Sequence, residues 1–190
     1  MKRGLRNNNP LNIRRSADRW EGERMEQTDP TFVQFTTMAY GYRAAWKVLE
    51  SYWKRFKQER KPFTVGNIIA RWAPHCENET EAYVKTVLKL TALGGNERLP
   101  RPFRGIALDK LGRLVAAMTV VECGICADQV DMQAVWEGYD KAFPGKRKTG
   151  KEIPHPGTSL TELPTPTTRP PAELMHHWDE YWDWSPLASA

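Results

Sequence analysis

The chain has 190 residues, of which 40% are hydrophobic, so it is long enough for one globular domain with a further segment. It contains no run of about 18 apolar residues, which excludes a membrane-spanning helix. The net charge of +5 is uneven, because residues 1–143 hold 23 Lys and Arg against 17 Asp and Glu, whereas residues 144–190 hold 5 against 6. A basic domain favours nucleic acid, a polyanionic cell wall or an acidic membrane face, but no basic run with interleaved aromatics supports specific nucleic-acid binding.

The first thirty-five residues read as loops. The basic start is not followed by an apolar stretch, so we expect cytoplasmic synthesis without a secretory signal peptide. To act in the cell wall or as part of a virion, such a protein would have to be released by cell lysis or a holin, or be carried by a virion or a secretion machine. Residues 7–10, Asn-Asn-Asn-Pro, have turn composition. Residues 24–27 and 32–35 flank a Thr-Asp-Pro turn and predict a small β-hairpin.

Helical patterns dominate from residue 40 onward. Apolar residues recur every fourth position over 40–56 and predict a long amphipathic helix. Thr64 precedes a short helix over 65–72, which Pro74 halts.

Three further helices follow in the second half of the predicted domain. Asn78 with Glu81 resembles a capping box that opens a helix ending at Gly94-Gly95. Residues 108–121 form the most apolar helix of the chain, and a last helix starts near Asp128 and Asp131 and ends near residue 143.

The composition changes at residue 146, since half of the 14 prolines lie between residues 154 and 186. We expect a domain over 1–145, a Pro-rich linker over 146–170 and a short amphipathic, Trp-rich tail over 171–190. A short helix in this tail would present one aromatic face. Two interpretations stay open: the tail docks on a partner, such as a virion or secretion-machine protein, or it folds back onto its own domain.

Glu122 is a charged residue at a position that the pattern expects to be buried. It follows Leu111, Val115 and Met118 on the apolar stripe, in the last turn of that helix, with Gly124 as a plausible stop. Desolvation and the helix dipole both raise the pKa of a carboxyl group there. A raised pKa keeps a general acid protonated near neutrality, although a Glu that reaches solvent or pairs with an Arg fits the same pattern.

Two other stretches combine carboxylates with aromatics. Trp72 precedes a loop that holds Glu77 and Asn78, and Trp20 precedes Glu21 on the predicted hairpin. Aromatic rings beside acids and amides suit sugar binding, although acids at a helix start are also favoured by the dipole. The three cysteines are best interpreted as free thiols, and we expect no metal and no cofactor.

Several motifs together resemble a family of phage-borne and prophage-borne proteins known as virion structural proteins. The resemblance covers about residues 3–126. Its blocks are Arg3-Gly4-Leu5-Arg6-Asn7-Asn8-Asn9-Pro10-Leu11-Asn12-Ile13-Arg14, Trp20-x-Gly22, Phe32-x-x-Phe35, Tyr40-Gly41-x-Arg43-Ala44 and Trp72-Ala73-Pro74-x-x-Glu77-Asn78-x-Thr80-x-x-Tyr83-x-x-x-Val87.

Part of the same sequence is similar to bacterial glucosaminidases and lytic transglycosylases. The similar segments are Asn8-Asn9-Pro10-Leu11-Asn12-Ile13 and Asn78-x-Thr80-x-x-Tyr83-x-x-x-Val87. In those enzymes the catalytic Glu ends a buried helix, in an E-x-G context, before the Asn-rich segment. Here the E-x-G helix that ends at Glu122 follows that segment, so we hypothesise a circular permutation.

The resemblance implies a mainly α, lysozyme-like domain with a small β-hairpin, which cleaves the glycan strand of peptidoglycan as a muramidase or lytic transglycosylase. Glu122 is then the expected general acid, with Glu77 or Glu21 as a candidate second carboxylate. The expected substrate-binding residues are Asn9, Asn12, Trp20, Trp72, Asn78 and Tyr83. The alternative is a non-catalytic virion structural or cell-wall-binding protein on the same scaffold.

Overall fold

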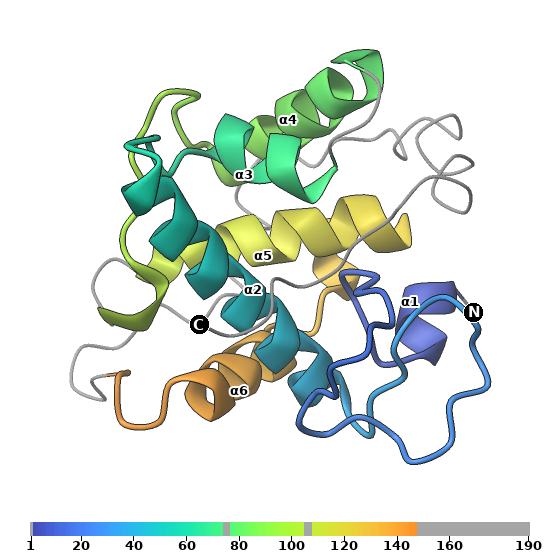
Figure 1. Ribbon diagram of the computed structural model, residues 1–190. Coiled ribbons are helices and arrows are strands. Elements are labelled where there is room, and N and C mark those ends of the chain that lie inside the picture. The colour runs from blue at the N-terminus through green and yellow to red at the C-terminus, as the bar shows by residue number, and fades with distance from the viewer. Residues whose placement is uncertain (1, 74–76, 105–107, 148–190) are drawn as a thin grey trace.

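Figure 1 shows a computed structural model of the chain, which describes residues 2–73, 77–104 and 108–147. Its helices are α1 (Arg3–Arg6), α2 (Met38–Gln58), α3 (Val65–Trp72), α4 (Glu77–Thr91), α5 (Leu108–Cys123) and α6 (Met132–Ala142), with 3-10 turns η1 (Pro102–Arg104) and η2 (Ala127–Gln129). The fold is mainly α, as the sequence predicts. None of the helices in these ranges is long and apolar enough to span a bilayer. The predicted linker and tail lie, from residue 148 on, outside the described residues.

Helix α5 runs through the middle of the domain, between the α3–α4 pair and α6, and α2 crosses in front of it (Figure 1). Twelve of its sixteen residues are buried, so it is apolar on nearly every side, as expected of a central core helix. Each buried Leu or Val stabilises the fold by roughly 1.5–3 kcal/mol relative to an exposed one. The domain is therefore assembled around the helix that carries Glu122 in its last turn.

The pairing of α2 with α6 forms the largest aromatic part of the core. The indole of Trp46 on α2 donates to the backbone oxygen of Val135 on α6 over 3.0 Å. Its ring meets Tyr139 edge to face, with centroids 5.1 Å apart. Gly138 lets the helices approach closely, because a Cβ there would lie 2.5 Å from a side-chain carbon of α2.

The predicted helix ends are largely confirmed. The hydroxyl of Thr64 and the carboxylate of Asp131 each accept a backbone N–H of the helix that follows. Helix α5 ends at Cys123, and Gly124 supplies the left-handed backbone that stops it (φ +55°). Helix α4 ends three residues before the predicted Gly94-Gly95 stop, because Ala92 takes the left-handed conformation itself (φ +53°).

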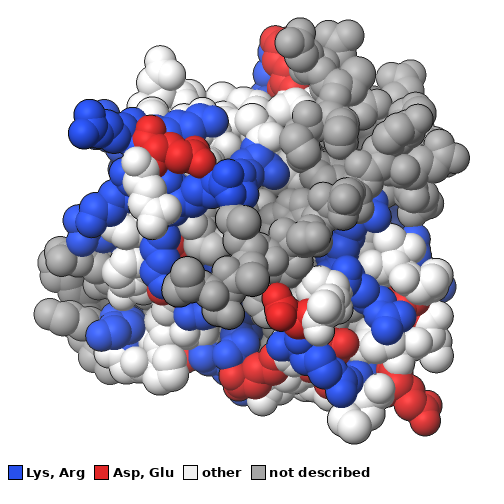
Figure 2. Space-filling view, viewed as in Figure 1, with Lys and Arg blue, Asp and Glu red and all other residues white. Residues whose placement is uncertain are grey.

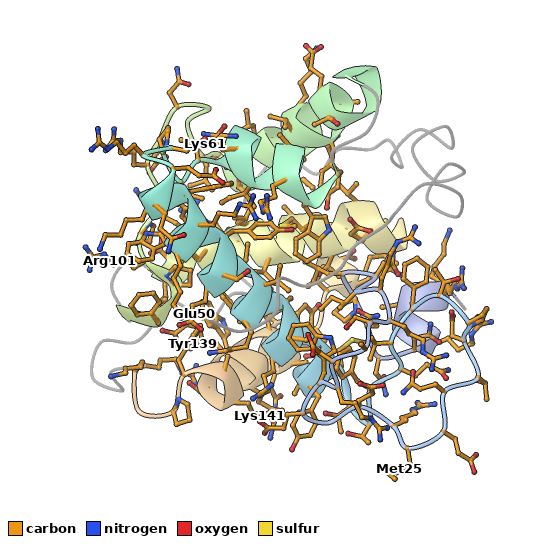
Figure 3. All side chains as sticks on the ribbon, viewed as in Figure 1. Met25, Glu50, Lys61, Arg101, Tyr139 and Lys141 are labelled. Carbon is orange, nitrogen blue, oxygen red and sulfur yellow. The ribbon has the colours of Figure 1, made fainter. Side chains whose placement is uncertain are left out.

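The predicted hairpin over residues 24–35 forms only in part: the Arg24 backbone N–H donates to the Gln34 backbone oxygen over 2.8 Å, but the two arms form no regular strands. Residues 31–36 form only two isolated bridges, one between Phe32 and Arg14 and one between Phe35 and Glu23, so they lie between two partners and build no regular strand. Side chains replace the missing ladder: the Gln34 backbone N–H donates to the Gln27 side chain over 2.7 Å. The intervening loop carries Met25, which points into solvent away from the helices (Figure 3).

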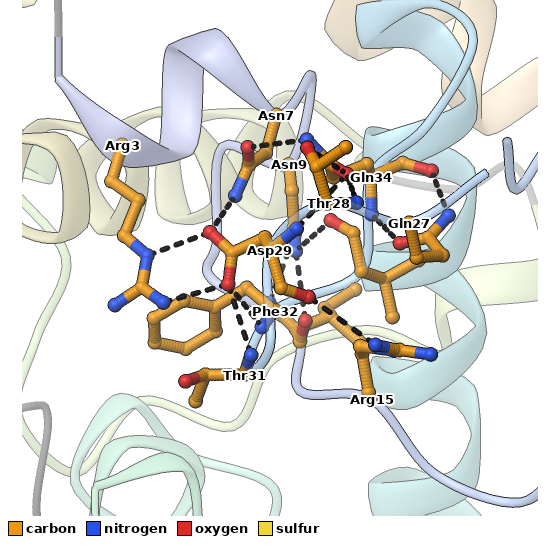
Figure 4. Close-up of polar contacts among 12 residues, drawn as sticks. Arg3, Asn7, Asn9, Arg15, Gln27, Thr28, Asp29, Thr31, Phe32 and Gln34 are labelled. Atoms are coloured by element: carbon orange, nitrogen blue, oxygen red, sulfur yellow. Dashed lines mark hydrogen bonds and ion pairs between the residues drawn. The ribbon is translucent and has the colours of Figure 1, made fainter.

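Buried polar contacts centred on Asp29 fix this N-terminal segment (Figure 4). The Arg3 guanidinium donates to both carboxylate oxygens, over 2.7 and 2.6 Å, and the Asn7 amide donates to one of them over 2.7 Å. The backbone N–H groups of Thr31 and Phe32 complete the set, each over 3.0 Å. Burial opposes ionisation of Asp29, but these donors outweigh it and hold the pKa of Asp29 well below its usual range.

Candidate active site around Glu122

The Glu122 carboxyl group is a meeting point of four parts of the chain. Its Oε1 accepts the Trp72 indole N–H over 3.0 Å and the Tyr83 hydroxyl over 3.1 Å. Its Oε2 accepts the Asn12 side-chain amide over 3.1 Å. The N-terminal loop, α3 and α4 thus each direct one donor at the end of α5.

Each donor is held by its own local structure. Asn12 has a left-handed backbone (φ +49°), which Asn tolerates better than most residues, and its amide also donates to the Glu122 backbone oxygen over 3.2 Å. Trp72 ends α3, where its ring meets the buried Tyr52 edge to face with centroids 6.1 Å apart. Tyr83 is 1% exposed in the body of α4. The three donors are therefore fixed in place before any ligand arrives.

Glu122 itself is partly buried, and its carboxyl group lies among protein atoms. This burial raises the pKa of Glu122 from 4.5 to about 7, although the hydrogen bonds from Asn12, Tyr83 and Trp72 act to lower it. Burial, together with the neighbouring Glu122 charge, also raises the pKa of Tyr83 well above its usual value. Near neutral pH the site thus holds a carboxyl group poised between its two protonation states and a phenol that stays protonated.

Such a group can deliver a proton and then remain as a stabilised carboxylate. Desolvation keeps the proton on Glu122 near pH 7, and three aligned donors await the negative charge that develops when the proton leaves. No Asp or Glu of the described residues hydrogen-bonds to this carboxyl group.

The N-terminal segment reaches the same end of α5 through close backbone contacts. The Cys123 thiol donates to the Pro10 backbone oxygen over 3.2 Å, and burial is the main cause that raises the pKa of Cys123 to about 12. Gly4 is required at this approach, since a Cβ there would lie 2.9 Å from the Asn9 backbone oxygen and 2.9 Å from the Cys123 sulfur. The thiol is therefore a packing group here.

Three of the predicted site residues, Asn12, Trp72 and Tyr83, converge on Glu122, and three others do not. Asn9 is fully buried, and its amide donates to the backbone oxygens of Ile13 and Val33 over 2.8 and 2.9 Å, so it shapes the loop that presents Asn12. Glu21 is exposed and forms an ion pair with Arg43 of α2.

Trp20 packs against the core, and its buried indole N–H has no hydrogen-bond partner in the structure. Its backbone N–H is held by Glu23 over 3.0 Å. No hydrogen bond joins Trp20 to Glu122.

Glu77 and Asn78 begin α4, in the same helix as Tyr83, but their side chains lie outside the described part of the structure. Among the residues that are described, no cluster of three His, Cys, Asp or Glu side chains has the geometry to hold a metal ion.

The sequence does not predict the polar contacts of Asp29 with Arg3 and Asn7. Arg3 and Asn7 lie in the Asn-rich motif, and the sequence pattern indicates only a turn at Asp29. No local signal links them in the sequence, because Arg3 and Asn7 lie 26 and 22 residues from Asp29.

No protein-family model matches the chain. The chain is 44% identical over 100 residues to Protein P5 of Pseudoalteromonas phage PM2, and the matched region covers 51% of this chain and 60% of the phage protein. The chain therefore spans about three fifths of the length of this curated relative. The finding shows that the chain has a homologue among bacteriophage proteins.

Proposed function

We propose that this protein cleaves the glycan strand of peptidoglycan, with Glu122 as the general acid. The observation that carries the proposal is the Glu122 carboxyl group, with its pKa raised to about 7 and three side-chain donors directed at it. The homologue from phage PM2 supports a bacteriophage setting for this activity. The resemblance of the Asn-rich and α4 segments to lytic transglycosylases supports a lysozyme-like, circularly permuted scaffold.

In the proposed reaction, Glu122 protonates the oxygen of the scissile glycosidic bond as that bond breaks. The resulting carboxylate accepts the hydrogen bonds of Asn12, Trp72 and Tyr83, which reduce the cost of its negative charge. The oxocarbenium-like sugar is then attacked by a hydroxyl of the substrate or by water, whose proton returns to Glu122.

For the attacking group we propose the substrate's own hydroxyl, as in a lytic transglycosylase, a reaction that needs no second carboxylate. A muramidase mechanism would need a second acid, and Glu77 at the start of α4 stays the candidate. Glu21 is the weaker candidate, because Arg43 engages it.

For the substrate, we propose that Asn78 binds sugar hydroxyls and that the rings of Trp20 and Trp72 stack on sugar faces. Asn12 and Tyr83 orient the acid, and Tyr83, which is 1% exposed, acts on the substrate only through Glu122. We assign Asn9 the supporting role of holding the Asn12 loop, since its amide is occupied by backbone.

The test is release of soluble muropeptides from purified peptidoglycan by the wild type, Glu122→Gln and Glu137→Gln. Glu137 is an exposed glutamate of α6, so its variant is the matched control. The proposal expects release by the wild type and the control, and none by a folded Glu122→Gln protein. Mass spectrometry of the products then distinguishes the two mechanisms. Attack by the substrate's own hydroxyl leaves anhydro ends, whereas attack by water leaves reducing ends. Release that survives Glu122→Gln would refute the assignment.

One feature of the site favours a second candidate, a non-catalytic virion structural or cell-wall-binding protein. All three donors already engage the Glu122 carboxyl group, as they would engage a structural buried acid. This function predicts binding to peptidoglycan or to a virion protein without muropeptide release by the wild type.

A further inference from the structure

A surface on the C-terminal half of α2 combines aromatic rings with cations that form no ion pair among the described residues. We call it the Trp53 face and define it by Trp53, Lys57, Lys61, Arg101 and Phe103. It is separate from the Glu122 site, and no step of the proposed cleavage uses it. Figure 3 shows Lys61 and Arg101 near the same end of α2. In Figure 2 basic side chains gather over this end of the helix.

Trp53 is the centre of this face. The Arg101 guanidinium lies over its ring at 4.8 Å from the centroid, and the Lys57 ammonium lies 5.7 Å from it. Phe103 meets the indole edge to face, with centroids 5.3 Å apart. Both rings are only partly buried. The face therefore offers apolar contact bordered by positive charge.

The acids near this face are already engaged. Glu59 pairs with Arg55 over 2.7 Å, and Glu50 pairs with Lys47 and with Lys54. Glu97 pairs with Lys110. Within the described ranges no ion pair involves Lys57, Lys61 or Arg101. A segment that carries both carboxylates and aromatic rings can therefore pair with these cations and pack against the rings of this face.

The chain itself contains a segment of this chemistry. Residues 171–190 hold four acids, no Lys or Arg, and three tryptophans; the relevant residues are Glu173, Trp178, Asp179, Glu180, Trp182, Asp183 and Trp184. The described chain ends at Arg147, four residues after Phe143, whose ring contacts Phe103 of this face with centroids 6.4 Å apart. The 26 residues from Arg147 to Glu173 can span roughly 85 Å when extended, far more than this path requires.

We propose that the acidic, Trp-rich segment 171–190 docks on the Trp53 face of its own domain. Its indoles pack against Trp53 and Phe103, and its carboxylates pair with Lys57, Lys61 and Arg101. Because the tether makes the contact intramolecular, even weak pairs suffice to populate it. Exposed pairs of this kind weaken with added salt, so docking is salt-sensitive.

The test is zero-length carbodiimide cross-linking of the full chain, which joins lysine amines to carboxylates in contact. The expected result is cross-links from Lys57 and Lys61 to acids of segment 171–190, with a yield that does not depend on protein concentration. Arg101→Glu leaves both reactive lysines in place, but its negative charge repels the acids of segment 171–190. It should lower these cross-links roughly tenfold, which corresponds to about 1.4 kcal/mol of docking free energy. Lys85→Glu, at an exposed position on α4, is the matched control and should leave them unchanged.

A second variant guards against misfolding of Arg101→Glu. Lys57→Glu changes an exposed helix position and should lower the remaining cross-links through Lys61. Adding Glu180→Arg to Arg101→Glu should restore them by exchanging the charges. Three results would overturn the proposal. Cross-links spread over lysines of other faces would show that the segment has no preferred site, and cross-links that disappear on dilution would report contact with a second copy of the chain. Cross-links that persist in Arg101→Glu, while this variant loses binding to a polyanion such as heparin, would show that the face binds another partner.

Discussion

Replacing Glu122 by Gln should change how the stability of the protein depends on pH. The folded-state pKa of Glu122 is about 7, above its ordinary value of 4.5, so the folded protein holds a proton between these values that the unfolded chain releases. The unfolding free energy of the wild type therefore falls as pH rises through this window. This difference in pKa corresponds to about 3 kcal/mol of unfolding free energy, most of which is lost between pH 5 and pH 8.

Glu122→Gln cannot ionise, so it does not suffer this loss. Relative to the variant, the wild type should lose about 2–3 kcal/mol of unfolding free energy between pH 5 and pH 8, or roughly 5–10 °C in Tm. Urea unfolding at the two pH values measures the difference, and any constant cost of the substitution cancels. Glu137→Gln is the control and should run parallel to the wild type. Parallel curves for Glu122→Gln as well would refute the raised pKa.

Three further predictions concern other contacts. Tyr83→Phe removes a donor that lowers the pKa of Glu122, so this pKa should rise further in a carboxyl-carbon NMR titration; an unchanged or lower value would contradict the contact. Asp29→Asn should destabilise the domain by about 2–3 kcal/mol in urea unfolding at pH 7, because Arg3 stays partly exposed and loses only part of its pairing. The folded-state pKa of Asp29 is depressed, so the difference should shrink as pH falls below about 4. Gly138→Ala places a methyl group 2.5 Å from a carbon of α2 and should lower the free energy of unfolding in urea by about 2 kcal/mol. A much smaller loss of stability would show that α2 and α6 separate easily.

The helices could be predicted from the sequence because their signals are local. The stripe over residues 40–56 and the apolar run over 108–121 follow the helical period, and Gly124 stops α5 at the expected place. The unusual position of Glu122 follows from the same periodicity. Its pKa could be predicted in direction, since a carboxyl group on an apolar stripe must be desolvated.

The N-terminal segment could not be predicted in the same way, because side chains from distant positions determine it. The partners of Asp29 include Arg3, 26 residues away, and Gln34 uses its amide to satisfy loop backbone. Alternating residues suggested a hairpin, but these contacts replace the strand ladder. The role of Asn9 depends on the same folding of the loop, which only the three-dimensional structure shows.

The pH dependence of muropeptide release tests whether protonated Glu122 cleaves glycan strands. The kcat/KM for release reports the pKa of the essential acid in the free enzyme. We expect kcat/KM to fall about tenfold per pH unit above a pKa of about 7, and we expect Glu122→Gln to abolish release. A rate that stays level from pH 6 to pH 9, or activity retained in folded Glu122→Gln, would contradict it.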